Sequence, residues 1–261
     1  MMKNDKNAVC RACGNIANWV FSGQLLDNVV DYYDCPHCGY VQTETPYWLD
    51  RAYAKAINET DTGIMVRNLA NAKIVLATLL ALKKLDGTLV DCAGGYGILV
   101  RLLRDYGINA LWSDLYCKNL VASGFERATE TADLVTAFEA FEHFVNPSEE
   151  LDRLLEIAPN VLFSTQIIAD LAPKQDDWWY YGKNHGQHIG FFRIQSLTKL
   201  ARDRGKYLIS DGANYHLISD QPLSEKTWKV MMWAGWLIPL VLRRSLTQHD
   251  HEMLMKKHES P

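Results

Sequence analysis

The stretch Thr88-Leu89-Val90-Asp91-Cys92-Ala93-Gly94-Gly95-Tyr96-Gly97 runs from a short β pattern into a glycine-rich turn. A helical pattern of apolar residues, 98–106, follows at once. In an open α/β sheet, ligands bind where a strand ends and such a turn leads into the next helix. The stretch therefore predicts a strand, a ligand loop and a helix of an α/β domain.

The chain beyond this loop alternates between strand and helix patterns. Strands are expected at residues 110–114, 133–138, 160–165, 206–210 and 215–219, and helices at 147–157 and 194–204. Such alternation predicts a parallel sheet with helices on both faces. The last two β runs are joined by only Gly212-Ala213-Asn214, so we expect them to pair antiparallel. The predicted fold class is α/β with an antiparallel last strand.

Four of the six cysteines form two CxxC pairs near the N-terminus: Cys10, Cys13, Cys35 and Cys38. The chain opens with no secretory signal pattern, so reduced thiols are expected. Two CxxC turns complete a tetrahedral all-cysteine site, which predicts a structural zinc in a small zinc-ribbon-like module. A redox CxxC is the alternative interpretation, although one pair would suffice for that chemistry.

The bulk composition is that of an ordered globular protein, with 48% hydrophobic residues and a net charge of -4. There is no basic block, so nucleic acid is not an expected partner. The longest apolar run, residues 230–242, is shorter than the roughly 20 residues that span a bilayer. A cytoplasmic location is expected.

The residues of the glycine loop discriminate between two ligand classes. A dinucleotide-binding loop of the form GxGxxG would need a third glycine where this chain has Val100, and Asp91 would repel a pyrophosphate. A ligand that carries an ammonium and a sulfonium would instead favour that carboxylate. The loop therefore favours S-adenosylmethionine (SAM).

Residues 60–220 resemble the class I SAM-dependent methyltransferases, with Ala93 where the commonest form of their first motif has glycine. The stretch Phe138-Glu139-Ala140-Phe141-Glu142-His143 resembles their E-x-x-E-H motif after the fourth strand. The resemblance implies a Rossmann-like sheet, ribose hydroxyls held by Asp114 and an adenine contact near Phe125. The implied cofactor-binding residues are Asp91, Ala93, Gly94, Gly95, Gly97, Asp114, Phe125 and Glu139.

The acceptor side is predicted in residues 176–188, which hold four consecutive aromatic residues, 178–181, and two histidines. Four such aromatics cannot all be buried, and an outward ring could stack on a sugar or a planar acceptor. His188, or else His185, is the expected general base, with Glu142 and His143 in the pocket or supporting it. The alternative is a packed lid whose histidines bond to the backbone.

A cysteine-rich zinc module before such a domain resembles sugar methyltransferases of deoxysugar and surface-polysaccharide pathways. That resemblance implies a small or glycan-like acceptor, methylated on a hydroxyl or an activated carbon. A non-catalytic zinc-module scaffold or SAM-sensing interaction protein is the second hypothesis, kept open by Ala93 and by the missing adenine aspartate. A nucleic-acid or protein methyltransferase is the third, and the absent basic patch counts against the first of these.

Four segments are predicted: a zinc-binding module (1–45), a helical lead-in (46–86), the SAM-dependent methyltransferase domain (87–222) and a C-terminal helical segment (223–261). The apolar part of the last segment, from Thr227 onward, is rich in tryptophan and is followed by Arg243 and Arg244. It is expected to pack on the domain or form a homodimer contact, or alternatively to make a peripheral membrane contact. Its tail, residues 249–252, is expected to be a solvated helix; the alternative is that its histidines and acids hold a metal.

Overall fold

The structure, a computed structural model, describes residues 7–53, 62–238 and 245–259. It divides into two compact units, residues 1–56, 138–153 and 163–222, and residues 57–137, 154–162 and 223–261. The four predicted segment boundaries stay a prediction. Parts of the helical lead-in (54–61) and of the C-terminal segment (239–244, with Arg243 and Arg244) lie outside the described residues.

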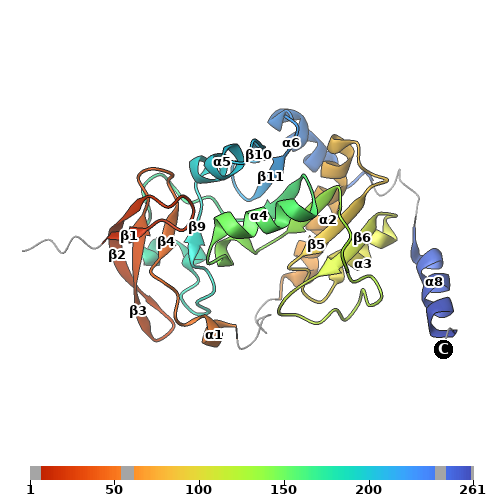
Figure 1. Ribbon diagram of the computed structural model, residues 1–261, viewed down its shortest axis with the longest axis horizontal. Coiled ribbons are helices and arrows are strands. Elements are labelled where there is room, and N and C mark those ends of the chain that lie inside the picture. The colour runs from red at the N-terminus through yellow and green to blue at the C-terminus, as the bar shows by residue number, and fades with distance from the viewer. Residues whose placement is uncertain (1–6, 54–61, 239–244, 260–261) are drawn as a thin grey trace, which may run out of the picture. The chain divides into compact units, whose positions relative to one another are not determined.

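The first unit contains a five-stranded antiparallel sheet of order β1-β2-β3-β4-β9 (Figure 1). Its strands are β1 (Asn7–Val9), β2 (Ile16–Leu25), β3 (Asn28–Asp34), β4 (Val41–Thr43) and β9 (Gly190–Phe191). Buried apolar side chains, among them Leu25, Tyr32, Val41, Tyr181 and Phe191, form a core cluster of this unit. The fifth strand comes from far along the chain, and a two-residue strand has no periodicity by which the sequence could reveal it.

The second sheet has six strands in the order β10-β11-β8-β7-β5-β6. They are β5 (Thr88–Cys92), β6 (Asn109–Ser113), β7 (Leu134–Ala137), β8 (Val161–Ser164), β10 (Tyr207–Ser210) and β11 (Tyr215–Ser219). β5 pairs in parallel with β6 and β7, whereas β10 and β11 pair antiparallel. The predicted α/β fold with antiparallel last strands is confirmed.

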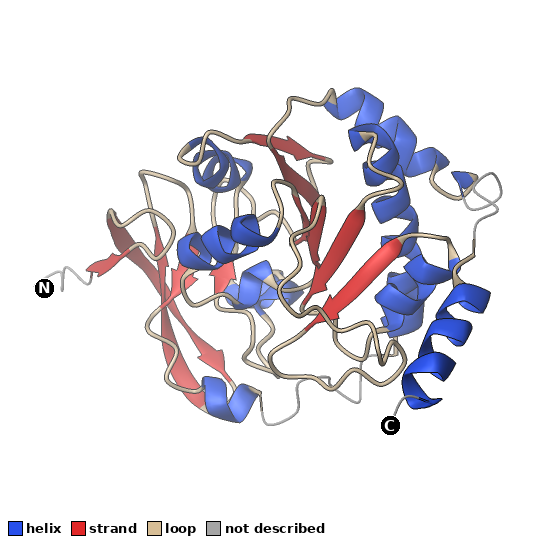
Figure 2. Cartoon of the chain, turned by 45° about the vertical axis from the view of Figure 1, so that its right-hand side comes forward, coloured by secondary structure: helices blue, strands red, loops and turns tan. Residues whose placement is uncertain are grey.

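The three helices predicted at 98–106, 147–157 and 194–204 are found with ends within two residues of the predicted ones. Figure 2 shows the helices in blue. They are α1 (Leu49–Ala52), α2 (Ile64–Leu82), α3 (Ile98–Asp105), α4 (Pro147–Ile157), α5 (Ile194–Arg202), α6 (Glu225–Ala234) and α8 (Thr247–Glu259). Among the described residues, α2 alone is long and apolar enough to cross a membrane. It packs against α3 and α6, and buried residues such as Val75 and Leu76 are those of a core helix.

Helix α6 packs on α2 through one tryptophan. The side chain of Trp228 is fully buried, and its Nε1 donates a hydrogen bond to Thr78 Oγ1 at 3.0 Å. Beyond it, Val230, Trp233 and Trp236 are exposed. The C-terminal segment therefore packs on the second unit through part of its apolar surface and leaves another part uncovered.

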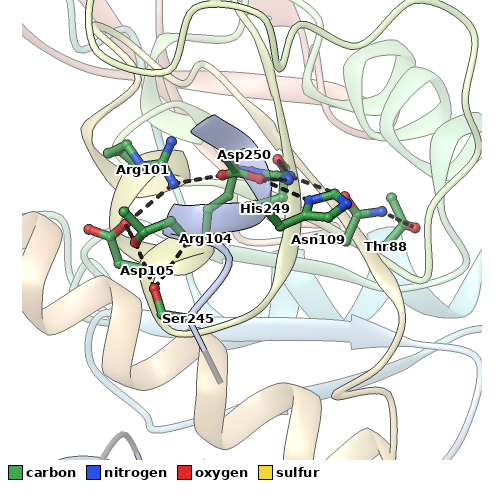
Figure 3. Close-up of polar contacts among 10 residues, drawn as sticks. Thr88, Arg101, Arg104, Asp105, Asn109, Ser245, His249 and Asp250 are labelled. Carbon is green, nitrogen blue, oxygen red and sulfur yellow. Dashed lines mark hydrogen bonds and ion pairs between the residues drawn. The ribbon is translucent and has the colours of Figure 1, made fainter. Parts of the chain in front are cut away.

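Helix α8 is fixed by a buried carboxylate, so the expectation of a wholly solvated tail is wrong for Asp250 (Figure 3). Asp250 Oδ2 accepts hydrogen bonds from Arg101 Nη2 at 2.7 Å and Arg104 Nε at 2.8 Å. Asp250 Oδ1 accepts another from Arg104 Nη2 at 2.7 Å. Arg104 also lies over the ring of Phe125, 3.8 Å from its centroid. Asp250 stands among polar and charged residues in the sequence, so no local pattern indicates that its side chain is buried in an ion pair.

Replacing this carboxylate, Asp250→Asn, is expected to lower the free energy of unfolding by about 3–5 kcal/mol, because Arg104 keeps its buried charge without a counter-ion. Urea denaturation at neutral pH measures the loss. Burial raises the pKa of Asp250, but the hydrogen bonds from Arg104 and Arg101 outweigh it and hold that pKa below the ordinary 3.8. Its stabilisation is therefore present above pH 3.8 and lost as the pH falls through the folded value.

The control is Asp203→Asn, which removes a half-exposed partner of Lys199 one helical turn away. We expect it to change stability by less than about 1 kcal/mol. Equal effects of the two substitutions would show that the buried ion pair does not stabilise α8.

Candidate active site and zinc centre

The glycine loop between β5 and α3 adopts left-handed backbone conformations. Gly95 and Gly97 have φ angles of 53° and 87°, and Ala93 has a φ of 67°. A side chain at such an angle is strained, which gives a physical reason for the glycine that is commonest at the position of Ala93. The Trp112 Nε1 donates to Gly95 O at 3.0 Å, so an aromatic side chain that the sequence did not single out braces the loop.

The structure brings Asp114 and the glycine loop together, because β5 and β6 are parallel neighbours and end at the same edge. Asp114 Oδ2 accepts a hydrogen bond from Gly95 N at 2.8 Å. Its Oδ1 accepts two, from Tyr116 N at 2.7 Å and Cys117 N at 2.8 Å. A carboxylate has about four acceptor positions, and three are used here, so Asp114 retains capacity for about one hydroxyl donor while it shapes the loop.

Asp91 is buried at the end of β5, and its Oδ1 accepts a hydrogen bond from Thr136 Oγ1 at 2.6 Å. Burial raises the pKa of Asp91 to about 7; Asp114 adds to the shift and Thr136 opposes it. Near neutral pH, Asp91 is therefore balanced between a neutral and an anionic form. Only the anion attracts an ammonium group strongly.

The affinity for SAM is expected to rise roughly tenfold between about pH 5.5 and pH 7, as Asp91 loses its proton while the SAM ammonium stays charged. Calorimetric titration at several pH values measures this. In the Asp91→Asn variant the affinity should be lower and nearly independent of pH over that range.

The control for this titration is Asp114→Ala, which should weaken SAM binding at every pH tested. Its slope against pH should persist, because Asp91 is intact. A flat profile for the unmodified chain would contradict the assignment of Asp91 to the cofactor.

Two other predicted cofactor residues, Phe125 and Glu139, already make contacts with other side chains of the protein. Phe125 is 4% exposed and lies in the core under Arg104, which favours packing over an open contact with adenine. Glu126, beside it, forms only an isolated bridge with Trp112 instead of a full strand. Glu139 has a φ of 50°, and its carboxylate accepts a hydrogen bond from Ser164 at 2.6 Å.

The four predicted metal ligands come together, with all four sulfurs within 4.8 Å of one another. The distance from Cys10 Sγ to Cys38 Sγ is 3.6 Å, and that from Cys13 Sγ to Cys35 Sγ is 3.7 Å. A tetrahedral zinc with Zn–S bonds of about 2.3 Å places its sulfurs about 3.8 Å apart. The cluster therefore fits a closed, structural zinc site, and these distances are too long for disulfides.

The acceptor-side residues cluster within the first unit. Glu142, His143 and His188 each offer one oxygen or nitrogen, and these atoms lie within 4.8 Å of one another. His188 Nδ1 is 2.6 Å from the carbonyl oxygen of Tyr180. Because a carbonyl only accepts, Nδ1 carries the hydrogen and Nε2 is left with a free lone pair. Two imidazoles and a carboxylate this close can pass a proton among them, and such a set can also ligate a cation.

Burial sets the protonation of this cluster. It lowers the pKa of His188 to about 3, with a further contribution from His185, and it lowers that of His143 well below its ordinary value. Burial also raises the pKa of Glu142 to about 8, assisted by Glu139. At neutral pH both imidazoles are uncharged, and the carboxyl group is largely protonated. Neither Glu142 oxygen makes a hydrogen bond of good geometry, although Tyr180 and Thr165 favour its ionised form.

His185 has a different role in the hydrogen-bond pattern. Its Nδ1 accepts a hydrogen bond from Gln187 N at 3.1 Å, and its ring packs edge-on against His188 with centroids 4.7 Å apart. Gly186 between them has a φ of 69°, and its carbonyl accepts a hydrogen bond from Trp48 Nε1 at 2.8 Å. The turn at Gly186 is thus fixed, which gives His188 a defined direction.

Of the four consecutive aromatics, Tyr180 and Tyr181 are buried in the core, and Trp178 is partly buried. Trp179 is 75% exposed. The prediction that some of these rings face outward is confirmed, and Trp179 is the ring open to a partner.

Several site residues were missed by sequence reasoning. Arg193 makes a bidentate ion pair with Asp34 at 2.8 Å and donates to Gly39 O, next to the second CxxC pair. Tyr53 Oη lies 2.9 Å from His143 Nδ1. These contacts join residues far apart in the sequence. Paired substitutions at these positions among related sequences are the signal that could have revealed them.

Comparison with known proteins adds a family match and several structural likenesses. The family described as "Methyltransferase domain" matches residues 66–210, more than half of the chain. The chain is similar to magnesium protoporphyrin IX methyltransferase from Synechocystis PCC 6803 with bound SAH, at 17% identity and a TM-score of 0.46, covering 66% of this chain and 92% of that one. The chain is also similar to an O-methyltransferase family protein from Burkholderia thailandensis, at 15% identity and a TM-score of 0.46, covering 69% of this chain and 64% of that one. None of the curated proteins matches.

Proposed function

Because the chain belongs to the methyltransferase domain family and is a SAM-dependent methyltransferase, we propose that it methylates a small or glycan-like acceptor, on a sugar or polysaccharide hydroxyl or an activated carbon. When bound, SAM supplies a methyl group on a sulfonium, which the acceptor displaces in line. Membership of an enzyme family argues against the alternative of a non-catalytic scaffold or SAM sensor.

The cofactor-side residues of this proposal are those at the glycine loop. Asp91, Gly95, Gly97 and Asp114 would hold SAM, with Asp91 toward the ammonium and Asp114 toward the ribose hydroxyls. Ala93 and Gly94 complete the turn. Phe125 and Glu139 remain candidates for contacts to the adenosine part of SAM. The ring of Phe125 is packed under Arg104, and the carboxylate of Glu139 accepts a hydrogen bond from Ser164.

The observation that carries the acceptor chemistry is the close approach of His188 to the buried carboxyl group of Glu142, with Nδ1 of His188 held by the carbonyl oxygen of Tyr180 so that Nε2 keeps its lone pair. We infer that Nε2 takes the proton of the acceptor as the methyl group is transferred. His188 is a weak base while Glu142 is neutral. Once Glu142 ionises, above about pH 8, its negative charge stabilises the imidazolium that forms. His143 and His185 pack against His188 and exclude water from it.

The sugar assignment is supported by the combination of a zinc module with an exposed aromatic ring. Trp179 presents an apolar face of the kind that stacks on a pyranose. The cluster at His188 provides an acceptor for a hydroxyl proton. A planar aromatic acceptor would use the same two features, so the acceptor class has to be tested directly.

The test is transfer of a labelled methyl group from SAM to a panel of nucleotide sugars, oligosaccharides and planar phenols, with mass spectrometry of the products. Labelled sugars that are lost with Trp179→Ala and retained with Trp19→Ala would support the proposal; Trp19 is a half-exposed control in β2. Labelling of phenols alone would overturn the sugar acceptor and leave the methyltransferase activity intact.

The uncovered apolar side chains of the C-terminal segment support a second proposal on location. Val230, Trp233, Trp236 and Leu237 are exposed, and we propose that they make a homodimer contact or a peripheral membrane contact in the cytoplasm. Sedimentation velocity and vesicle flotation distinguish the two. A monomer that stays off vesicles would exclude both.

A further inference from the structure

The main chain of Ile189, the residue after His188, is held by hydrogen bonds at both its N–H and its carbonyl group. Ile189 N donates a hydrogen bond to Glu142 O at 2.9 Å. Ile189 O accepts one from Thr43 N at 3.0 Å and a second from Arg11 Nη2 at 2.6 Å. The last of these is short and charge-assisted, which makes it the strongest of the three. The main chain at His188 is therefore oriented by residues of the N-terminal sheet and of the zinc turn.

Arg11 is itself held by the zinc turn, because it lies between the ligands Cys10 and Cys13. Its backbone N donates to Gln42 Oε1 at 2.7 Å, and Gln42 Nε2 donates to Val9 O at 2.9 Å. These bonds fix the main chain from which the Arg11 side chain extends. A shift of the zinc turn would therefore move the guanidinium that binds Ile189 O.

Contacts on either side of Ile189 restrict the movement of the main chain at residues 189–191. Gly190, after Ile189, pairs with Gln42 in the β4–β9 ladder. A methyl group on Gly190 would clash with the hydroxyl of Tyr40. The main chain from residue 189 to 191 thus lies directly against the zinc module. Orientation at His188 depends on that contact.

The guanidinium of Arg11 is otherwise poorly satisfied. Within the described part of the chain, the buried side-chain atoms without a hydrogen-bond partner belong to three residues, Arg11, Tyr40 and Glu142. In Arg11 they are Nε and Nη1. Burying a cation at this cost for packing alone is unfavourable, since an apolar side chain would fill the space more cheaply. The hydrogen bonds of Arg11 Nη2 to Ile189 O and, more weakly, to Thr43 Oγ1 are what the buried guanidinium contributes to this part of the structure.

We propose that Arg11 is a positioning residue for His188, and that the zinc turn thereby orients the base of the reaction. The inference rests on the proposed function only for the role of His188 as base. It assigns the zinc module a part in the acceptor site in addition to its part in folding. Arg11 does not touch the acceptor in this scheme.

The test compares Arg11→Met and Arg11→Lys with the control Arg51→Met, which removes an exposed arginine paired with Asp27. Long-range proton–nitrogen correlation spectra report which ring nitrogen of His188 carries the hydrogen. We expect Nδ1–H in the unmodified chain, in Arg11→Lys and in the control. Arg11→Met should show a mixture of the two tautomers while it keeps one zinc per chain. Its kcat for methyl transfer should fall roughly 10- to 100-fold with an unchanged KM for SAM.

Each outcome decides the inference. An Arg11→Met protein with bound zinc and an unchanged His188 spectrum would overturn it. Loss of zinc from Arg11→Met and also from Arg11→Lys would overturn it too, because Arg11 would then serve the fold of the module. An altered tautomer in a chain that transfers no methyl group would support positioning by Arg11 and contradict the proposed function instead.

Discussion

Removal of the zinc is expected to unfold the N-terminal sheet. Structural zinc binds to zinc-finger peptides with an apparent free energy of roughly 10–16 kcal/mol, which is as large as the roughly 5–15 kcal/mol net stability of a whole domain. Cys35→Ser, or a strong chelator, should therefore abolish the ordered signals of β1 to β4. Metal analysis and amide hydrogen exchange followed by mass spectrometry measure the loss of zinc and of protection.

The hydrogen-exchange pattern gives this prediction an internal control. Protection in β5, β6 and β7 should change little, because the described contacts of these strands do not include the cysteine cluster. Cys92→Ser is the matched substitution, since that cysteine lies at the end of β5 and belongs to neither CxxC pair. Retention of ordered β1 to β4 in a chain shown to be free of zinc would contradict the structural assignment.

The His188→Asn variant is expected to lose roughly 10²- to 10⁴-fold in the rate of methyl transfer, the usual contribution of a general base. The asparagine amide can replace Nδ1–H as a donor to Tyr180 O, so the segment keeps its main contact while Nε2 is removed. Steady-state kinetics with the acceptor identified by the panel measure the effect. Calorimetry should show SAM affinity unchanged within about twofold, which corresponds to about 0.4 kcal/mol.

The matched control is His185→Asn, which alters the ring packed against His188 and leaves Nε2 of His188 in place. We expect a loss smaller than tenfold, about 1.4 kcal/mol or less. If His185→Asn were the more damaging of the two, the base would have to be reassigned to His185. Equal activity of both variants and the unmodified chain would exclude both His188 and His185 as the base.

The parts of the site that could be predicted from the sequence are those carried by local patterns. The spacing of Cys10, Cys13, Cys35 and Cys38 encodes the metal centre, because each pair forms one tight turn. The position of Asp114 at the end of the next strand follows from the parallel order of β5 and β6. The resemblance to the E-x-x-E-H motif singled out Glu142 and His143, which lie together in one turn, Phe141–His143; their roles stay a prediction.

The parts that could not be predicted depend on contacts between distant segments. The bond of Arg11 to Ile189 O joins residues separated by most of the chain, and no local pattern encodes it. Strand β9 is too short to show periodicity. Asp250 is polar within a polar tail, so its burial follows only from the packing of α8 against α3. In each case the contact partner is distant in the sequence and becomes apparent only from the tertiary structure.

The late position of β9 in the chain has a consequence for synthesis on the ribosome. The cysteines emerge first and can bind metal early, but β4 remains an unpaired edge until residues 190–191 have left the exit tunnel. An exposed edge strand is a template for pairing with other chains. A nascent or truncated chain that ends before β9 is therefore expected to aggregate even when it is loaded with zinc. The interval between the first cysteine pair and β9 is the period in which a chaperone would have most to protect.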